Sequence, residues 1–219
     1  MKFFIGYDTS QHEAAMVCQK SLERWVDKKD IFFLNVHELR AGGHYWREHS
    51  GNESTEFSYT RFLVPYLSNF TGESVFCDSD FLWVDDPRVL ASANGPAVRV
   101  VKHDILPGQL SSTKMNGKVQ EWYPMKNWSS MMLFNNAHPD CTNLTPEAVS
   151  EMSSQWLHQF RWTDMDKSAA LPRRFNHLVG YYPKTDGLAA IHFTDGGPWL
   201  PGYEDVEYAE EWRLVQRSA

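Results

Sequence analysis

The first 36 residues carry a hydrophobic pattern that constrains the fold more than any other part of the chain. Residues 2–7 form a short apolar run typical of a strand, and residues 31–36 form a second one. Between them, Ser10 with Glu13 three positions later matches a capping box and predicts a helix that begins there. Parallel strands need such a crossover, and the crossover is right-handed. The pattern therefore predicts an α/β fold with a mixed, mostly parallel central sheet flanked by helices.

A pair of carboxylates interrupts the apolar stretch at residues 75–84. Asp78 and Asp80 stand two positions apart, at the end of a run that we interpret as a buried strand. Two carboxylates this close repel each other unless a cation lies between them, and hard cations prefer oxygen ligands. The alternative is that both are turn or cap residues, because a second Asp-x-Asp occurs at Asp164 and Asp166. The apolar flanks favour the metal site without excluding the turn.

The rest of the chain continues the alternation of strands and helices. Two polar segments interrupt it, at residues 40–56 and 102–127. We interpret the first as a substrate loop and the second as an excursion over the pocket mouth. The further elements that we expect are a helix at 57–69 with Arg61 outside its buried stripe, strands at 97–101, 130–134 and 188–193, a helix at 145–160, and a C-terminal helix at 204–217 docked by Tyr208, Trp212 and Val215.

Length and composition narrow the class of protein. A chain of 219 residues without a clear linker predicts a single domain, 1–219. The net charge of −7 argues against a general nucleic-acid binder. Three widely spaced cysteines predict a reducing compartment, and the short apolar start is too short for a signal peptide, so we expect a cytoplasmic protein. We expect no transmembrane segment.

Several motifs in this order resemble the glycosyltransferases of the GT-A fold, and family 8 in particular. The most specific are Asp78-Ser79-Asp80, the segment Ser58 to Leu67 before it, and His192 followed by Gly196-Gly197-Pro198-Trp199. The resemblance implies a metal-dependent glycosyltransferase that moves a sugar from a nucleotide-sugar, a UDP-sugar, to an unknown acceptor with retention of configuration. It also implies a nucleotide-binding half at about 1–101 and a half for the acceptor and donor sugar at about 102–219.

The resemblance also implies roles for individual residues. Asp78, Asp80 and His192 look like ligands of Mn²⁺ or Mg²⁺, although a strand-end histidine can equally be a hydrogen-bonded core residue. Asp164 and Asp166 match the catalytic segment that touches the donor sugar. The residues implied to bind the nucleotide or the donor are Tyr7, Asp8, Arg61, Ser79, Trp128, Ser129, Gly196 and Gly197.

Departures from the family pattern leave two other functions open. Gly197 stands where the family has a lysine, so a cation for the diphosphate is either missing or comes from Lys184, Arg173 or Arg174. Met165 replaces a glutamine, and Gln11 or His12 replaces a stacking tyrosine. A non-catalytic module that binds a sugar nucleotide or carbohydrate is therefore an alternative. A nucleotidyltransferase is a weaker one, because residues 7–13 lack the glycine and basic residues that hold a triphosphate.

Overall fold

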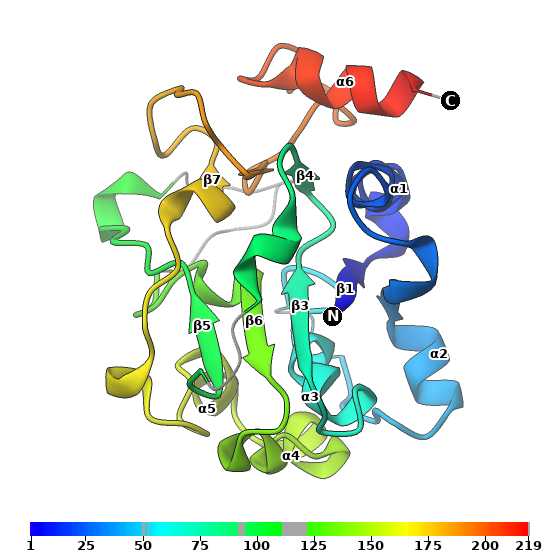
Figure 1. Ribbon diagram of the computed structural model, residues 1–219, viewed down its shortest axis with the longest axis vertical. Coiled ribbons are helices and arrows are strands. Elements are labelled where there is room, and N and C mark those ends of the chain that lie inside the picture. Colours follow the sequence, from blue (N-terminus) through cyan, green and yellow to red (C-terminus); the bar gives the residue numbers. More distant parts are fainter. Residues whose placement is uncertain (50, 52, 92–94, 111–121, 219) are drawn as a thin grey trace.

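A five-stranded sheet forms the centre of the molecule in a computed structural model, which describes residues 1–49, 51, 53–91, 95–110 and 122–218 (Figure 1). Its strands are β1 (Lys2–Tyr7), β2 (Ile31–Asn35), β3 (Glu73–Cys77), β5 (Val98–Val100) and β6 (Met131–Asn135), in the order β2-β1-β3-β6-β5. β1 pairs in parallel with β2 and β3, whereas β6 is antiparallel to β3 and β5. The predicted mixed, mostly parallel sheet is confirmed, since β6 alone of these five strands is reversed.

Alternate side chains of the central strands enter two separate cores. In β3, Val75 and Cys77 face one core and Phe76 faces the other, as period-two strands require. The core around Phe76 packs under α2 (Val36–Ala41), α3 (Val64–Leu67), α4 (Pro146–Glu151) and α5 (Ser154–His158). The opposite core packs against α1 (His12–Glu23). Both faces of the sheet are thus covered, which explains why its central strands are apolar throughout.

A second, smaller sheet extends the layer that contains α1. It consists of β4 (Phe81–Trp83), β8 (Ala190–His192) and β7 (His177–Leu178), in that order. α1 contacts β4 on one side and the C-terminal helix α6 (Ala209–Arg217) on the other. In Figure 1 the two helices from opposite ends of the chain, blue and red, lie side by side. Tyr208, Trp212 and Val215 are buried, as predicted, in a cluster with Val17 of α1 and residues of the small sheet.

Several predicted boundaries were wrong, for identifiable physical reasons. α1 begins at His12 without a capping box, because the Asp8 carboxylate caps a preceding 3₁₀ turn by accepting a hydrogen bond from the Ser10 N–H. The segment at 57–69 is a 3₁₀ turn (Thr60–Leu63) and the short α3, since Pro65 in the first turn of α3 lacks an N–H. β2 ends at Asn35, one residue before the end of the predicted run at 31–36. It lies at the edge of the sheet, so Phe32 is 39% exposed.

The helix predicted at 145–160 is two helices. α4 ends at Glu151, and Ser153 caps α5 by accepting a hydrogen bond from the Trp156 N–H. The excursion predicted at 102–127 lies partly at 111–121, outside the described residues. Within the described ranges, no helix combines the length and apolar character needed to cross a bilayer.

Candidate metal centre and nucleotide site

The polar residues that follow the central strands meet at one edge of the sheet. The register pairs Ile5 with Cys77 and Cys77 with Met131, so β1 and β3 end where β6 begins. The Asp78 N–H donates to the Ser130 carbonyl at 2.9 Å and extends this pairing by one residue. Ligands of open α/β sheets bind beyond the carboxyl ends of the strands. A ligand site is therefore expected at this edge.

Asp78, Asp80 and His192 form the group that could hold a metal ion. The two aspartates flank the turn from β3 to β4, and His192 on β8 pairs with Phe81 across the small sheet. One ligand atom from each of the three residues lies within 4.8 Å of the others, and His192 Nε2 is 3.2 Å from Asp80 Oδ1. Ligand atoms held about 2.1–2.5 Å from one ion are at most about 5 Å apart. The spacing and the donor set of two carboxylates and one imidazole therefore fit a single divalent cation.

Asn176 fixes the orientation of the His192 ring. Asn176 Oδ1 lies 2.9 Å from His192 Nδ1, while Asn176 Nδ2 donates to Ser130 Oγ at 2.9 Å. An amide oxygen only accepts, so His192 Nδ1 donates its proton to Asn176, and Nε2, which faces Asp80, is the nitrogen placed to bind a metal. Metal-binding histidines are usually held in this way through their second nitrogen. The sequence alone gives Asn176 no role, because its partners come from distant segments.

Arg61 holds the second carboxylate of the group. The sequence placed it outside the buried stripe of a helix, which was wrong, since it is only 5% exposed. Its Nη1 lies 2.9 Å from Asp78 Oδ1 and donates to the Ser129 carbonyl at 2.8 Å. The guanidinium also lies over the rings of Phe57 and Phe76. Arg61 therefore orients Asp78 from a buried position.

Asp8, directly after β1, uses its carboxylate to hold the turn that follows the strand. Its Oδ1 accepts from the Ser10 N–H at 2.9 Å and from Ser10 Oγ at 2.6 Å, and its Oδ2 accepts from the Glu56 N–H at 3.0 Å. Glu56 in turn accepts from the N–H and hydroxyl of Thr9. Tyr7, one residue earlier, bonds His12 Nδ1 through its hydroxyl at 2.9 Å. A role of Tyr7 and Asp8 in base binding stays a prediction.

Three further predicted residues have side chains that form hydrogen bonds with other segments of the chain. Ser79 is fully buried and donates to Gln11 Oε1 at 2.7 Å. Trp128 Nε1 donates to the His103 carbonyl at 2.9 Å. Ser129 Oγ is 2.9 Å from His158 Nδ1. Burial, together with the charges of Arg61, Lys126 and Arg47, lowers the pKa of His158 to about 3, so this ring is neutral near pH 7.

Gly196 and Gly197 are glycines for reasons of packing. A Cβ on Gly197 would lie 2.0 Å from the Trp199 ring, and one on Gly196 would lie 2.7 Å from the Tyr203 ring. Gly196 also has a φ of 143°, which favours glycine. A lysine in place of Gly197 would therefore collide with Trp199, which is a physical reason for that departure from the family pattern.

The three cations that could replace this lysine differ in their surroundings. Lys184 pairs with Glu211 at 3.8 Å, and Arg174 forms a short ion pair with Asp85. Arg173 instead lies 4.3 Å from the ring centre of Tyr182, whose hydroxyl is 2.8 Å from His103 Nδ1. Burial, with the charges of His192 and Arg173, lowers the pKa of His103 to about 3. Lys184 and Arg174 also lie over aromatic rings, those of Tyr208 and Phe175, so their ion pairs with carboxylates are what distinguishes them from Arg173.

Asp164 and Asp166 lie in an exposed turn and are not members of the three-residue group. Asp164 accepts from the Asp166 N–H at 3.1 Å. Lys102, which follows β5, donates to the Ser168 carbonyl at 3.1 Å and so ties this turn to the same sheet edge. The contact of Asp164 and Asp166 with a donor sugar stays a prediction.

Solved structures with the same fold are glycosyltransferases. WbbM, a bifunctional glycosyltransferase, superposes with a TM-score of 0.68 at 16% identity over 100% of this chain and 50% of its own. GlyE of Streptococcus pneumoniae TIGR4 gives 0.61 at 12% over 100% and 61%. The galactosyltransferase LgtC, in complex with donor and acceptor sugar analogs, gives 0.59 at 14% over 99% and 95%. The chain thus spans half of WbbM and less than two thirds of GlyE, and the likeness confirms the GT-A-like fold.

A sequence relative defines the family. No protein-family model matches the chain. Protein CDI of Arabidopsis thaliana is 38% identical over 219 residues, which cover 96% of this chain and 84% of the relative. Identity at this level over nearly the whole length goes beyond a shared fold, and the chain belongs to the family of Protein CDI.

Proposed function

We propose that this protein is a metal-dependent glycosyltransferase that uses a nucleotide-sugar donor. The observation that carries the proposal is the convergence of Asp78, Asp80 and His192 at the carboxyl edge of a glycosyltransferase fold. The buried Asn176 behind His192 supports a ligand role over that of an ordinary core histidine, because it presents Nε2 to the group.

The three residues would hold Mn²⁺ or Mg²⁺, and an imidazole beside two carboxylates favours Mn²⁺. The bound ion would supply positive charge to the diphosphate that leaves the donor. Arg61 keeps Asp78 in place, and Asn176 keeps a lone pair of His192 directed at the ion's position. Asp78 and His192 are thus oriented before a ligand arrives.

Arg173 is our candidate for the cation that replaces the missing lysine. Lys184 and Arg174 each have a carboxylate partner, whereas Arg173 stacks on Tyr182 beside His103. An exposed arginine on an aromatic ring is held in place yet keeps its N–H donors for a phosphate.

The remaining assignments complete the proposal. The nucleotide is UDP. It binds near Tyr7, Asp8 and Ser79, in the half at about 1–101, and near the Trp128–Ser130 turn, in the half at about 102–219. Asp164 and Asp166 orient or stabilise the donor sugar, and transfer retains configuration. We assign no covalent nucleophile. The three cysteines are buried and free, which supports our proposal of a cytoplasmic location.

The test is metal-dependent release of UDP from UDP-glucose and UDP-galactose, measured with and without Mn²⁺. Asp80→Asn keeps the shape of a side chain that is 5% exposed but removes its charge, so we expect loss of Mn²⁺-dependent turnover in a folded protein. Asp186→Asn, at an exposed position in the loop before β8, is the matched control and should behave as wild type. Equal turnover in Asp80→Asn and wild type would contradict the proposal. Nucleotide binding without any turnover would favour the non-catalytic module.

A further inference from the structure

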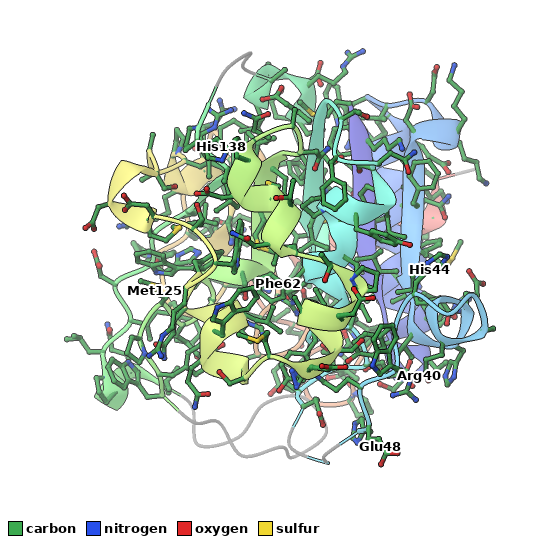
Figure 2. The ribbon with its side chains drawn as sticks, turned by 90° about the horizontal axis from the view of Figure 1, so that it is seen from below. Arg40, His44, Glu48, Phe62, Met125 and His138 are labelled. Carbon is green, nitrogen blue, oxygen red and sulfur yellow. The ribbon has the colours of Figure 1, made fainter. Side chains whose placement is uncertain are left out.

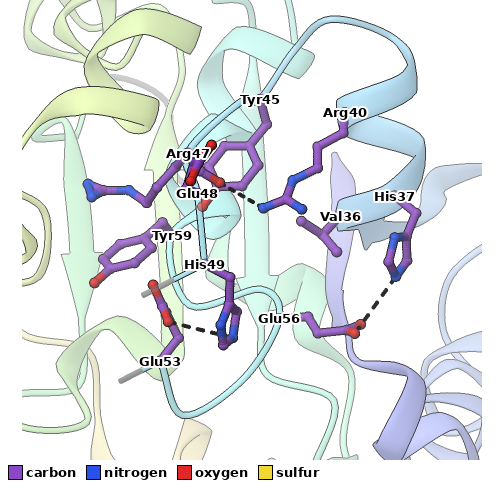
Figure 3. A pocket seen from close by; sticks show the side chains of 10 residues that line it. All are labelled: Val36, His37, Arg40, Tyr45, Arg47, Glu48, His49, Glu53, Glu56 and Tyr59. Atoms are coloured by element: carbon purple, nitrogen blue, oxygen red, sulfur yellow. Dashed lines mark hydrogen bonds and ion pairs between the residues drawn. The ribbon is translucent and has the colours of Figure 1, made fainter. Parts of the chain in front are cut away.

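A small cavity lies beside the candidate site, where β2 ends and α2 begins. Its volume is about 190 Å³, and its walls come from α2 and from residues 45–49 and 53–59 of the segment that follows α2. Figure 2 shows Arg40, His44 and Glu48 on the same side of the molecule, away from Met125 and His138. Figure 3 shows the side chains of α2 and of this segment arranged around the opening.

Two walls of the cavity contact residues of the candidate nucleotide site. On one side, the N–H of Glu56 donates to Asp8 at 3.0 Å. On the other, the ring of Tyr59 packs 5.7 Å from that of His158, which bonds Ser129. A ligand in the cavity would therefore lie next to the proposed donor.

The charges in the walls are mixed and nearly balanced. Two arginines, Arg40 and Arg47, face three glutamates, Glu48, Glu53 and Glu56. A histidine lies near each of two of these carboxylates. His37 Nε2 is 3.8 Å from Glu56 Oε1, and His49 Nε2 is 3.5 Å from Glu53 Oε2. Three carboxylates disfavour a phosphate or another anion, and so many charged groups disfavour an apolar ligand.

Sugar hydroxyls match these walls, since each hydroxyl donates to a carboxylate and accepts from a guanidinium. Tyr45 and Tyr59 also line the cavity, where Arg40 lies over the ring of Tyr45 and Arg47 over that of Tyr59, so these rings hold the two guanidinium groups in place. Pockets for drug-sized ligands measure roughly 300–1,000 Å³, so a cavity of about 190 Å³ suits a single ring. A shallower hollow next to it shares Arg40, Arg47 and Glu48 and adds Trp46, which is 45% exposed.

We propose that the cavity binds a neutral hexose unit of the acceptor, with the next sugar unit over Trp46. The assignment of this ligand as the acceptor rests on the proposed transferase function. The binding of a neutral sugar to the cavity rests on its walls alone.

Saturation-transfer NMR and calorimetric titration with methyl glucoside, methyl galactoside, methyl mannoside, maltose and lactose test the inference. We expect binding of at least one neutral glycoside, and tighter binding of a disaccharide. Glu48→Gln removes the charge of an exposed lining side chain and should weaken binding about tenfold or more, the usual effect of losing a charged hydrogen bond. Trp46→Ala should abolish the preference for the disaccharide. Glu38→Gln, on the same helix but outside the cavity, is the control and should bind as wild type.

The outcomes separate the two proposals. Absence of binding of every neutral glycoside, unchanged affinity in Glu48→Gln, or tighter binding of glucose 6-phosphate, glucuronate or uridine at this position would overturn the inference. Asp80→Asn should still bind the glycoside, because the cavity does not include the metal group. Glycoside binding in a protein that never binds Mn²⁺ with UDP would mean that the transferase proposal fails while the sugar site stands.

Discussion

Replacing Asn176 by alanine tests the account of how the metal group is held. Asn176 is fully buried, and its amide bonds His192 and Ser130, each at 2.9 Å. The substitution leaves the His192 N–H buried without an acceptor, which costs about 1–3 kcal/mol, and the lost second bond adds about 1 kcal/mol. We therefore expect the free energy of unfolding to fall by about 2–4 kcal/mol, out of the roughly 5–15 kcal/mol of a typical domain.

The same substitution should weaken Mn²⁺ binding, because the His192 ring can rotate or change tautomer. Losing the second partner of a metal-binding histidine typically lowers affinity by about 10–100-fold. Asn136→Ala is the matched control: Asn136 is also fully buried and donates to the Thr71 carbonyl and to Ser74 Oγ, but it lies at the opposite end of β6. It should cost similar stability and leave Mn²⁺ affinity unchanged.

Urea unfolding gives the stabilities, and calorimetric titration with Mn²⁺ gives the affinities of the folded proteins. Asn176→Asp keeps an acceptor for the His192 N–H, so it should recover most of the Mn²⁺ affinity that alanine loses. If Asn176→Ala bound Mn²⁺ as tightly as wild type, or if Asn136→Ala lost as much affinity, the reasoning about His192 would be refuted.

Three further predictions address other contacts. Arg173→Ala should weaken Mn²⁺–UDP binding by about tenfold or more, as expected for a lost charged hydrogen bond, whereas Arg174→Ala should not; equal effects in calorimetry would refute the assignment. His158 stays neutral in the folded state to about pH 3, so unfolding, which lets it protonate, becomes easier below about pH 6.5 by about 1.4 kcal/mol per pH unit. Urea unfolding between pH 7 and 4.5 should show this fall, and His158→Asn should reduce the slope by about that amount, leaving the similar contribution of His103; identical slopes would contradict the burial argument. Burial raises the pKa of Cys18, which lies 3.8 Å from Cys77 Sγ, so a thiol reagent should label both only after unfolding, and rapid labelling of the native protein would show that the helix–sheet contact opens.

The sheet was predictable because its signal is local. Short apolar runs separated by a capped or amphipathic segment define parallel strands, and the strand ends then place Asp8 and Asp78 at one edge. The metal group was predicted from the resemblance of its motifs to a known family, and the pairing of β4 with β8 explains how it assembles, since Asp80 precedes β4 and His192 ends β8.

Features that depend on tertiary contacts were not predictable. Phe57 packs so closely on Gly6 that a Cβ there would lie 2.3 Å from its ring, and this contact shapes the segment that carries Arg61. No periodicity in the sequence shows that Arg61 turns inward to Asp78, because its partners come from β3 and from Ser129. Asn176 was missed likewise, since a buried amide is recognised only by what it bonds.

Calorimetric titration of the protein with UDP, GDP, CDP and ADP, each with and without Mn²⁺, tests the central claim most directly. The account predicts selective binding of UDP that requires Mn²⁺ and is lost in Asp80→Asn. Binding of another nucleoside diphosphate would keep the metal site and change the donor. Absence of metal-dependent binding for all four would contradict the claim that Asp78, Asp80 and His192 form a working metal centre.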